Sequence, residues 1–184
     1  MKVMVEVSNR HVHLSKEVYD FLFDETMNKV RDLSQTGEFV SDKFVSIVTE
    51  NNIIENVRVL GPIRNYSQVE ISKKDAIKLG INPPVRASGN LDGATKITIK
   101  TAKNEYTNNI CIIAQRHIHM SYEDAKKLNI TNGQKAKIII DNERSGVMDA
   151  YFKLSEKGVF AAHIDTDEAA AFSINQGDEF ELHF

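Results

Sequence analysis

The sequence predicts a mainly β protein, built of small β-barrels that are capped by short α-helices. Its apolar runs are short, as strands require, and none approaches the ~18 residues of a membrane-spanning helix. A unit of strand, capped short helix, turn and strand recurs along the chain, and such a unit cannot bury its apolar face alone. Repeated units of this kind interlock as small barrels. The length of 184 residues suits one compact domain or two small ones.

Taken in order, the chain opens with an apolar run at residues 3–7 that predicts the first strand. Ser15 is predicted to be an N-cap, and the helical spacing of the apolar residues after it predicts a helix over 16–23. The polar stretch 24–39 predicts a linker with some helix. Two strands are then expected on either side of a turn at Asn51 and Asn52, at 44–48 and 54–60.

The repeated unit is clearest in three later segments of the chain. Each has a serine or aspartate followed three residues later by an acid, which is the capping-box pattern of a helix start. The three pairs are Ser72 and Asp75, Ser121 and Asp124, and Asp165 and Glu168. A short helix, a turn and a new strand should follow each pair. The strands are expected at residues 85–86, 136–140 and 179–184.

The most specific motif, Arg-His-x-His followed by an apolar residue and serine, occurs twice. It begins at Arg10 and again at Arg116, and it holds four of the six histidines of the chain. In a strand, residues two apart point to the same face, so each His-x-His pair presents two imidazoles together. Two neutral imidazoles can begin a site for a first-row metal. One isolated pair fits hydrogen-bonded surface histidines equally well, but the duplication favours a metal site.

The register of the repeat supplies a third ligand for each histidine pair. Glu70, His119 and His163 all lie two residues before an expected helix cap, and His13 has the same place before Ser15. Three ligands leave a position for water or substrate, as in catalytic zinc sites. We therefore predict two metal sites, one of His11, His13 and Glu70, and the other of His117, His119 and His163.

The remaining histidine and the single cysteine are expected to take no part in the chemistry. His183 lies outside every copy of the repeat and should be on the surface. Cys111 lies in the apolar run 110–114 and is predicted to be a core residue rather than a nucleophile. One cysteine excludes a disulfide within the chain and suits a reducing compartment. The net charge of −3 indicates neither a nucleic acid nor a membrane as partner.

Five segments together resemble the PduL-type phosphate acyltransferases, also called phosphate propanoyltransferases or phosphotransacylases. They are residues 8–15, 60–64, 68–72, 115–121 and 163–169. The resemblance implies reversible conversion of a short-chain acyl-CoA (acetyl- or propanoyl-CoA) and phosphate to an acyl phosphate and CoA at a two-metal site. It also implies two six-stranded β-barrels, two divalent metal ions per chain, usually taken as zinc, and a homodimer.

The resemblance also implies domain boundaries and residue roles. The family's first strand belongs with its C-terminal half, so residues 1–9 with 115–184 should form one barrel and 10–114 the other. The family's metal ligands fall on the six residues named above. Its essential arginine falls on Arg64, which follows Gly61 and Pro62 in an expected loop, and a forked guanidinium suits phosphate.

The sequence leaves two roles open for the arginines that precede the histidine pairs. Arg10 and Arg116 each precede a histidine pair, and they either contact phosphate or CoA or form structural salt bridges near the site.

Relatives that are packed into bacterial microcompartments carry an extension ahead of the first strand. This chain begins its first strand within three residues of Met1, which predicts a cytoplasmic enzyme without such targeting.

Two other functions compete with acyl transfer. His-x-His followed by Glu17 or Glu123 is a partial cupin pattern, typical of a single-metal enzyme or a sugar-binding module. The second cupin motif is missing, however, and the helix dipole explains an acid at each of these helix starts. The other alternative is that the metals only stabilise the fold. Structural zinc sites usually have four protein ligands, so sites of three ligands argue against it. Turnover of acetyl-CoA with phosphate, with and without a chelator, distinguishes the three.

Overall fold

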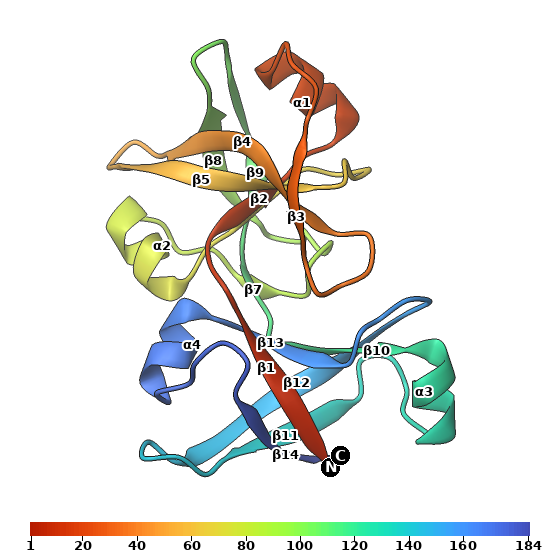
Figure 1. Ribbon diagram of the computed structural model, residues 1–184. Coiled ribbons are helices and arrows are strands. Elements are labelled where there is room, and N and C mark those ends of the chain that lie inside the picture. Colours follow the sequence, from red (N-terminus) through yellow and green to blue (C-terminus); the bar gives the residue numbers. More distant parts are fainter. The chain divides into compact units, whose positions relative to one another are not determined.

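The computed structural model describes residues 1–184, which form fourteen strands and four short helices (Figure 1). The chain divides into two compact units, and each is described by itself. Unit 1 consists of Met1–Asn9 with Gln115–Phe184, and unit 2 consists of Arg10–Ala114. Each unit is built around a sheet that closes into a six-stranded barrel. The predicted fold class, two six-stranded barrels with short helices, is therefore confirmed.

The barrel of unit 1 is closed by the first strand of the chain. Figure 1 shows this strand, β1, in red among the blue and cyan strands. It pairs in parallel with β13 and antiparallel with β14, so the barrel has the order β1-β13-β10-β12-β11-β14. The six strands are β1 Lys2–Ser8, β10 His117–Ser121, β11 Lys135–Ile140, β12 Gly146–Ser155, β13 Ala161–Asp165 and β14 Glu179–His183.

The barrel of unit 2 closes through β8, which pairs antiparallel with both β4 and β9. The closed ring is β4-β5-β2-β6-β9-β8, and β3 and β7 attach to its outside at β4 and β9. The eight strands are β2 His11–His13, β3 Lys29–Asp32, β4 Phe39–Val48, β5 Ile53–Gly61, β6 Gln68–Glu70, β7 Val85–Arg86, β8 Thr95–Lys100 and β9 Glu105–Ala114.

All four helices begin at the residues that the sequence predicts as caps. In each case a serine or aspartate in extended conformation accepts a backbone N–H of the first turn, which satisfies a donor that would otherwise lack a partner. None of these helices, which have six or seven residues each, could span a lipid bilayer. The helices, each with its cap, are α1 Lys16–Leu22 with Ser15, α2 Lys73–Leu79 with Ser72, α3 Tyr122–Lys127 with Ser121, and α4 Thr166–Ala171 with Asp165.

The capping box itself is complete only in α4. There the Glu168 side chain accepts the backbone N–H of Asp165 at 3.1 Å. In α2 the equivalent Asp75 turns to Arg10, and in α3 Asp124 accepts the hydroxyl of Ser121 instead. The prediction of three capping boxes is therefore wrong for α2 and α3, because another donor competes for each carboxylate.

The segment 24–39 also differs from the prediction, because it contains the strand β3 and no helix. Strand β4 is longer than the predicted 44–48, and its early residues offer β3 an edge to pair with. Asp42 fixes this pairing, since its carboxylate accepts the backbone and side-chain N–H groups of Asn28, each at 3.0 Å. Strands β8, β9 and β12 also lie outside the predicted strands.

Each barrel has its own hydrophobic core, and strand alternation decides which side chains enter it. In unit 1 the core includes Ile118 and Phe152, and in unit 2 it includes Val12 and Cys111. Cys111 is fully buried, as predicted, and burial raises the pKa of its thiol to about 12. His183 is exposed, which confirms its predicted surface position.

Two neighbouring isoleucines of β5 test this core assignment. Ile54 is 5% exposed and packs in the core of unit 2, whereas Ile53 is 40% exposed. Ile54→Ala should lower the free energy of unfolding by about 2–5 kcal/mol, because it removes buried methyl groups and leaves a cavity. Ile53→Ala should cost less than about 1 kcal/mol. Urea denaturation followed by circular dichroism measures both, and equal losses would contradict the assignment.

Candidate metal centres

In unit 1, three histidines meet on two adjacent strands. His117 and His119 are two residues apart on β10, so both point to one face of the strand. Strand β13 pairs antiparallel with β10, and this register places His163 opposite His117. One nitrogen of each ring lies within 4.8 Å of the others. The structure therefore brings together the three residues that the sequence predicts as one metal site.

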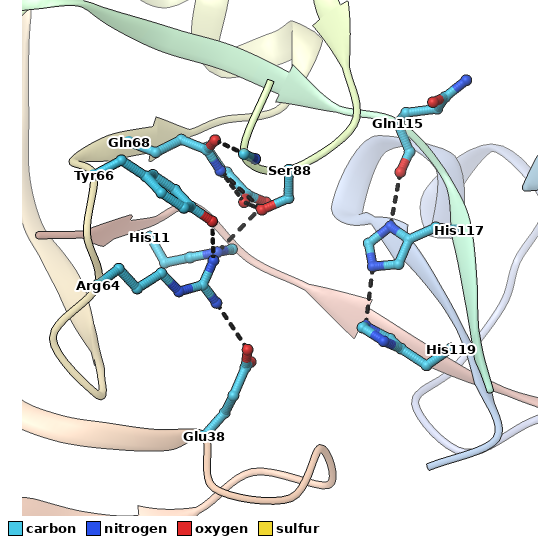
Figure 2. Close-up of polar contacts among 11 residues, drawn as sticks. His11, Glu38, Arg64, Tyr66, Gln68, Ser88, Gln115, His117 and His119 are labelled. Carbon is cyan, nitrogen blue, oxygen red and sulfur yellow. Dashed lines mark hydrogen bonds and ion pairs between the residues drawn. The ribbon is translucent and has the colours of Figure 1, made fainter. Parts of the chain in front are cut away.

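The hydrogen bonds of His117 prepare its ring to bind a metal (Figure 2). Its Nδ1 lies 2.8 Å from the carbonyl oxygen of Gln115, which can only accept, so Nδ1 carries the hydrogen. The lone pair of the neutral ring is then on Nε2, which lies 3.1 Å from Nε2 of His119. Two nitrogens bound to one tetrahedral zinc lie about 3.3 Å apart. An outer hydrogen bond to a backbone carbonyl is also usual for metal-binding histidines.

In unit 2, two histidines and a glutamate meet in the same way. His11 and His13 lie on β2, and Glu70 on β6 is paired with His11 in the antiparallel register. Their ligand atoms lie within 4.8 Å of one another, and His11 Nε2 is 3.5 Å from Glu70 Oε2. His13 is 3% exposed and Glu70 is 7% exposed. This second set of three is also the one that the sequence predicts.

Two side chains that the sequence analysis did not identify orient Glu70. The amide of Gln68 and the hydroxyl of Ser88 both donate to Glu70 Oε1, at 2.5 and 2.8 Å. Gln68 is held in turn by the backbone N–H of Gly89, which donates to its Oε1 at 2.8 Å (Figure 2). Oε1 is thus engaged and Oε2 faces His11. The signal for Gln68 was its place two residues before Glu70, on the same face of the strand.

The donor chemistry of both clusters fits a divalent transition metal. Imidazole nitrogens and a carboxylate are the donors that zinc and similar ions take, and each cluster offers three of them at one point. The acids of the partial cupin pattern do not join either cluster. Glu17 is exposed, and Glu123 forms a surface ion pair with Lys127.

Arg64 lies between β5 and β6, as expected, but its side chain is more buried than a loop position suggests, at 17% exposed. Its guanidinium donates to Glu38 Oε1 at 2.8 Å and to the Tyr66 hydroxyl at 2.7 Å (Figure 2). Its backbone N–H donates to Leu14, which ties the loop to the end of β2. Glu38 and Tyr66 therefore fix the orientation of the Arg64 guanidinium.

Arg64 also lines an open cavity of about 710 Å³ within unit 2. The start of α1 contributes Ser15 and Lys16 to the wall, and Tyr66 and Leu91 line it as well. The cavity thus combines two cationic side chains and one carboxylate, that of Glu17, with aromatic and aliphatic surface. Such a lining suits a ligand that is anionic at one part and apolar at another.

Arg10 and Arg116 occupy equivalent places and form equivalent ion pairs. Arg10 donates to both carboxylate oxygens of Asp75 at 2.8 Å, and Arg116 Nε lies 2.8 Å from Glu168 Oε1. Each pair ties the residue before a His-x-His motif to the helix that follows the third ligand. Of the two roles open for these arginines, the salt bridge is present, and contact with phosphate or CoA stays a prediction.

The environment of the two acids differs. Asp75 is 5% exposed, and each of its carboxylate oxygens accepts a hydrogen bond from the guanidinium of Arg10. Burial raises the pKa of Glu168 to about 7, and the charge of Arg116 opposes this shift without cancelling it.

Comparison with known proteins assigns the chain to a class. A family model described as phosphate propanoyltransferase matches residues 4–175. A phosphate propanoyltransferase of Thermotoga maritima is 41% identical over 181 residues, covering 96% of this chain and 86% of the relative. Those of Levilactobacillus brevis (39% over 177 residues; 95% and 85% covered) and Lachnoclostridium phytofermentans (41% over 180 residues; 95% and 84% covered) are similar. The protein is thus an acyltransferase. It belongs to the phosphate propanoyltransferase family, as the resemblance predicted.

We expect the ion pair between Arg10 and the buried Asp75 to stabilise the fold more than an exposed ion pair does. Asp75→Asn should lower the free energy of unfolding by about 1–3 kcal/mol, because a bidentate charged hydrogen bond is lost at a buried position. Asp20→Asn serves as the control, since Asp20 pairs with Lys16 on the surface and should cost less than about 1 kcal/mol. Urea denaturation measures both variants. An Asp75→Asn variant as stable as wild type would remove the structural role of Arg10.

Proposed function

We propose that the protein transfers the acyl group of a short-chain acyl-CoA, acetyl- or propanoyl-CoA, to phosphate in a reversible reaction that yields an acyl phosphate and CoA. One observation carries the proposal: a member of the phosphate propanoyltransferase family presents two three-ligand clusters at equivalent positions of its internal repeat. The geometry of the ligand atoms and the outer hydrogen bonds of His117 and Glu70 support a metal in each.

His11, His13 and Glu70 would hold one divalent ion, and His117, His119 and His163 would hold the second. Zinc is the proposed identity, because it takes histidine and carboxylate donors and leaves a position open in catalytic sites. When bound, such ions supply Lewis-acid character, which neutralises phosphate and polarises a carbonyl oxygen.

In the proposed reaction, a phosphate oxygen forms a bond to the acyl carbonyl carbon while the bond from that carbon to sulfur breaks. CoA leaves as its thiolate, which is a good leaving group, so no covalent intermediate with the enzyme is required. Cys111 is no candidate nucleophile, since it is fully buried and its thiol has a pKa raised to about 12. Phosphate is largely deprotonated near neutral pH, so no dedicated base is required either.

Arg64 is the proposed catalytic residue of this reaction. Its forked guanidinium matches two oxygens of a phosphate or the developing charge on a carbonyl oxygen. Glu38 and Tyr66 hold the fork in one direction, and the cavity beside it would receive part of the acyl-CoA. Lys16 on the same wall adds a second positive charge for the phosphate groups of CoA.

The proposal extends to organisation and location. The two units would be the two domains of the protein, residues 1–9 with 115–184 and residues 10–114, and the resemblance to the family supports this division. The same resemblance supports a homodimer. A single, buried cysteine supports a reducing compartment, and we propose the cytoplasm.

Turnover of the purified protein tests the proposed reaction. Acetyl-CoA and propanoyl-CoA are each supplied with phosphate, and release of the CoA thiol and formation of acyl phosphate are measured. Release should depend on phosphate, should stop after metal removal with a chelator, and should return when zinc is added. Sulfate in place of phosphate is the control. Metal-loaded protein that releases no CoA in the presence of phosphate would contradict the proposal.

Replacement of Arg64 separates catalysis from folding. Arg64→Ala should keep the metal content of the wild type and lose about 100- to 1,000-fold in kcat, the usual effect of removing one oriented donor at a reacting oxygen. Arg64→Lys should recover only part of the rate, because it restores the charge without the fork. Arg31→Ala, on the exposed strand β3, is the control. Activity near that of the wild type in Arg64→Ala would remove Arg64 from the mechanism.

A further inference from the structure

Tyr66, in the loop between β5 and β6, places its hydroxyl beside the guanidinium of Arg64. Nη1 of Arg64 donates to this hydroxyl at 2.7 Å, and both side chains line the open cavity of unit 2 (Figure 2). The tyrosine ring is not stacked closely on the cation, since Cζ of Arg64 lies 5.7 Å from the ring centroid. The contact between the two side chains is therefore made by the hydroxyl.

The hydroxyl of Tyr66 retains a hydrogen that it can donate. A phenolic hydroxyl accepts through its lone pairs and donates through one hydrogen. Tyr66 uses a lone pair for Arg64, and no protein group accepts its hydrogen. Because a cation donates to the oxygen, the O–H bond is polarised and becomes a better donor. This O–H is thus available to a ligand in the cavity.

Arg64 keeps donors for the same ligand. A guanidinium has five N–H groups, and Glu38 and Tyr66 take two of them, which leaves three. The two hydrogens on Nη1 point about 120° apart, so an oxygen at the second hydrogen lies too far from the Tyr66 hydroxyl to accept from both groups. A single carbonyl oxygen therefore does not match this pair of donors. A ligand with several oxygens, such as phosphate, does.

The charges around the cavity favour a neutral donor at this place. Glu38 compensates part of the charge of Arg64, Lys16 pairs with Asp20, and Glu17 adds a carboxylate to the cavity wall. An anion that binds here consequently depends on direct hydrogen bonds as well as on charge. The hydroxyl of Tyr66 supplies such a bond.

The hydroxyl also lies next to the loop that orients a ligand of the unit 2 centre. A Cβ atom added at Gly89 would lie 3.5 Å from the hydroxyl oxygen of Tyr66. The backbone N–H of Gly89 donates to Gln68, which in turn donates to Glu70. Phosphate beside Tyr66 would therefore lie near the proposed metal ion of this unit.

We propose that Tyr66 is a phosphate-binding residue, whose hydroxyl donates a hydrogen bond to the phosphate held by Arg64. This inference rests on the proposed function and deepens it, because it assigns a second donor to the phosphate substrate. The hydrogen stays on the oxygen of Tyr66 throughout, so the bonds that form and break in the proposed reaction are unchanged.

Phosphate binding to the zinc-loaded, full-length protein tests this role in the absence of acyl-CoA. Tyr66→Phe keeps the ring and removes only the hydroxyl. It should raise the dissociation constant of phosphate, measured by ³¹P NMR titration, by about 10- to 100-fold, because a hydrogen bond to an anion is lost. In turnover, KM for phosphate should rise in the same way while KM for acetyl-CoA stays within about twofold. Tyr122→Phe, on the exposed surface of α3, is the matched control.

A double variant separates direct contact with phosphate from an effect through Arg64. If the hydroxyl touches phosphate, Tyr66→Phe should weaken phosphate binding by at least about threefold in an Arg64→Ala background as well. An effect that disappears in this background overturns the proposal, since Tyr66 then only orients Arg64. Unchanged phosphate binding in Tyr66→Phe overturns it too, and so does a wild type that binds no phosphate. A wild type that binds phosphate without transferring the acyl group contradicts the proposed reaction alone, and phosphate binding by Tyr66→Phe still decides the role of Tyr66.

Discussion

The strand register of the two barrels is the constraint on which the candidate centres depend. Each centre takes its side chains from an antiparallel pair, β10 with β13 in one unit and β2 with β6 in the other. A shift of one residue in either pair would turn the ligands to the opposite face, because side chains alternate along a strand. The capped helices that follow limit such a shift, since each cap lies two residues beyond a ligand and fixes where the strand ends.

Placing polar side chains in a barrel wall requires further partners to hold them. The carbonyl of Gln115 sets the tautomer of His117, and Gln68 with Ser88 engages one oxygen of Glu70. Each centre is thus oriented by hydrogen bonds from outside it, as is usual where ligands must be ready before an ion arrives. The two barrels reach this result with different groups, so the internal repeat preserves the arrangement rather than the residues.

Local patterns in the sequence predicted a large part of this structure. The helix caps, the strand at each ligand and the six proposed ligands all follow from the repeat, and His163 could be grouped with His119 because both precede a cap. Glu6, whose carboxylate lies 2.8 Å from Nε2 of His163, could not be found in this way. It lies in β1, outside the repeat, and its nearness to His163 exists only because the barrel closes through strands that are far apart in the chain. The strand β3 was missed for a related reason, since its four residues are all exposed and form a strand only because β4 offers an edge.

The origin of β1 at the opposite end of the chain from its barrel partners affects the order of folding. As the chain is synthesised, unit 2 has all its strands once residue 114 has emerged, whereas β1 must wait for β13 and β14. Until then its backbone groups have no strand to pair with, and contacts between such distant segments form slowly. The barrel whose strands emerge last is also the one that contains the three histidines. Binding of an ion there would therefore report that synthesis and folding of the C-terminal part are complete.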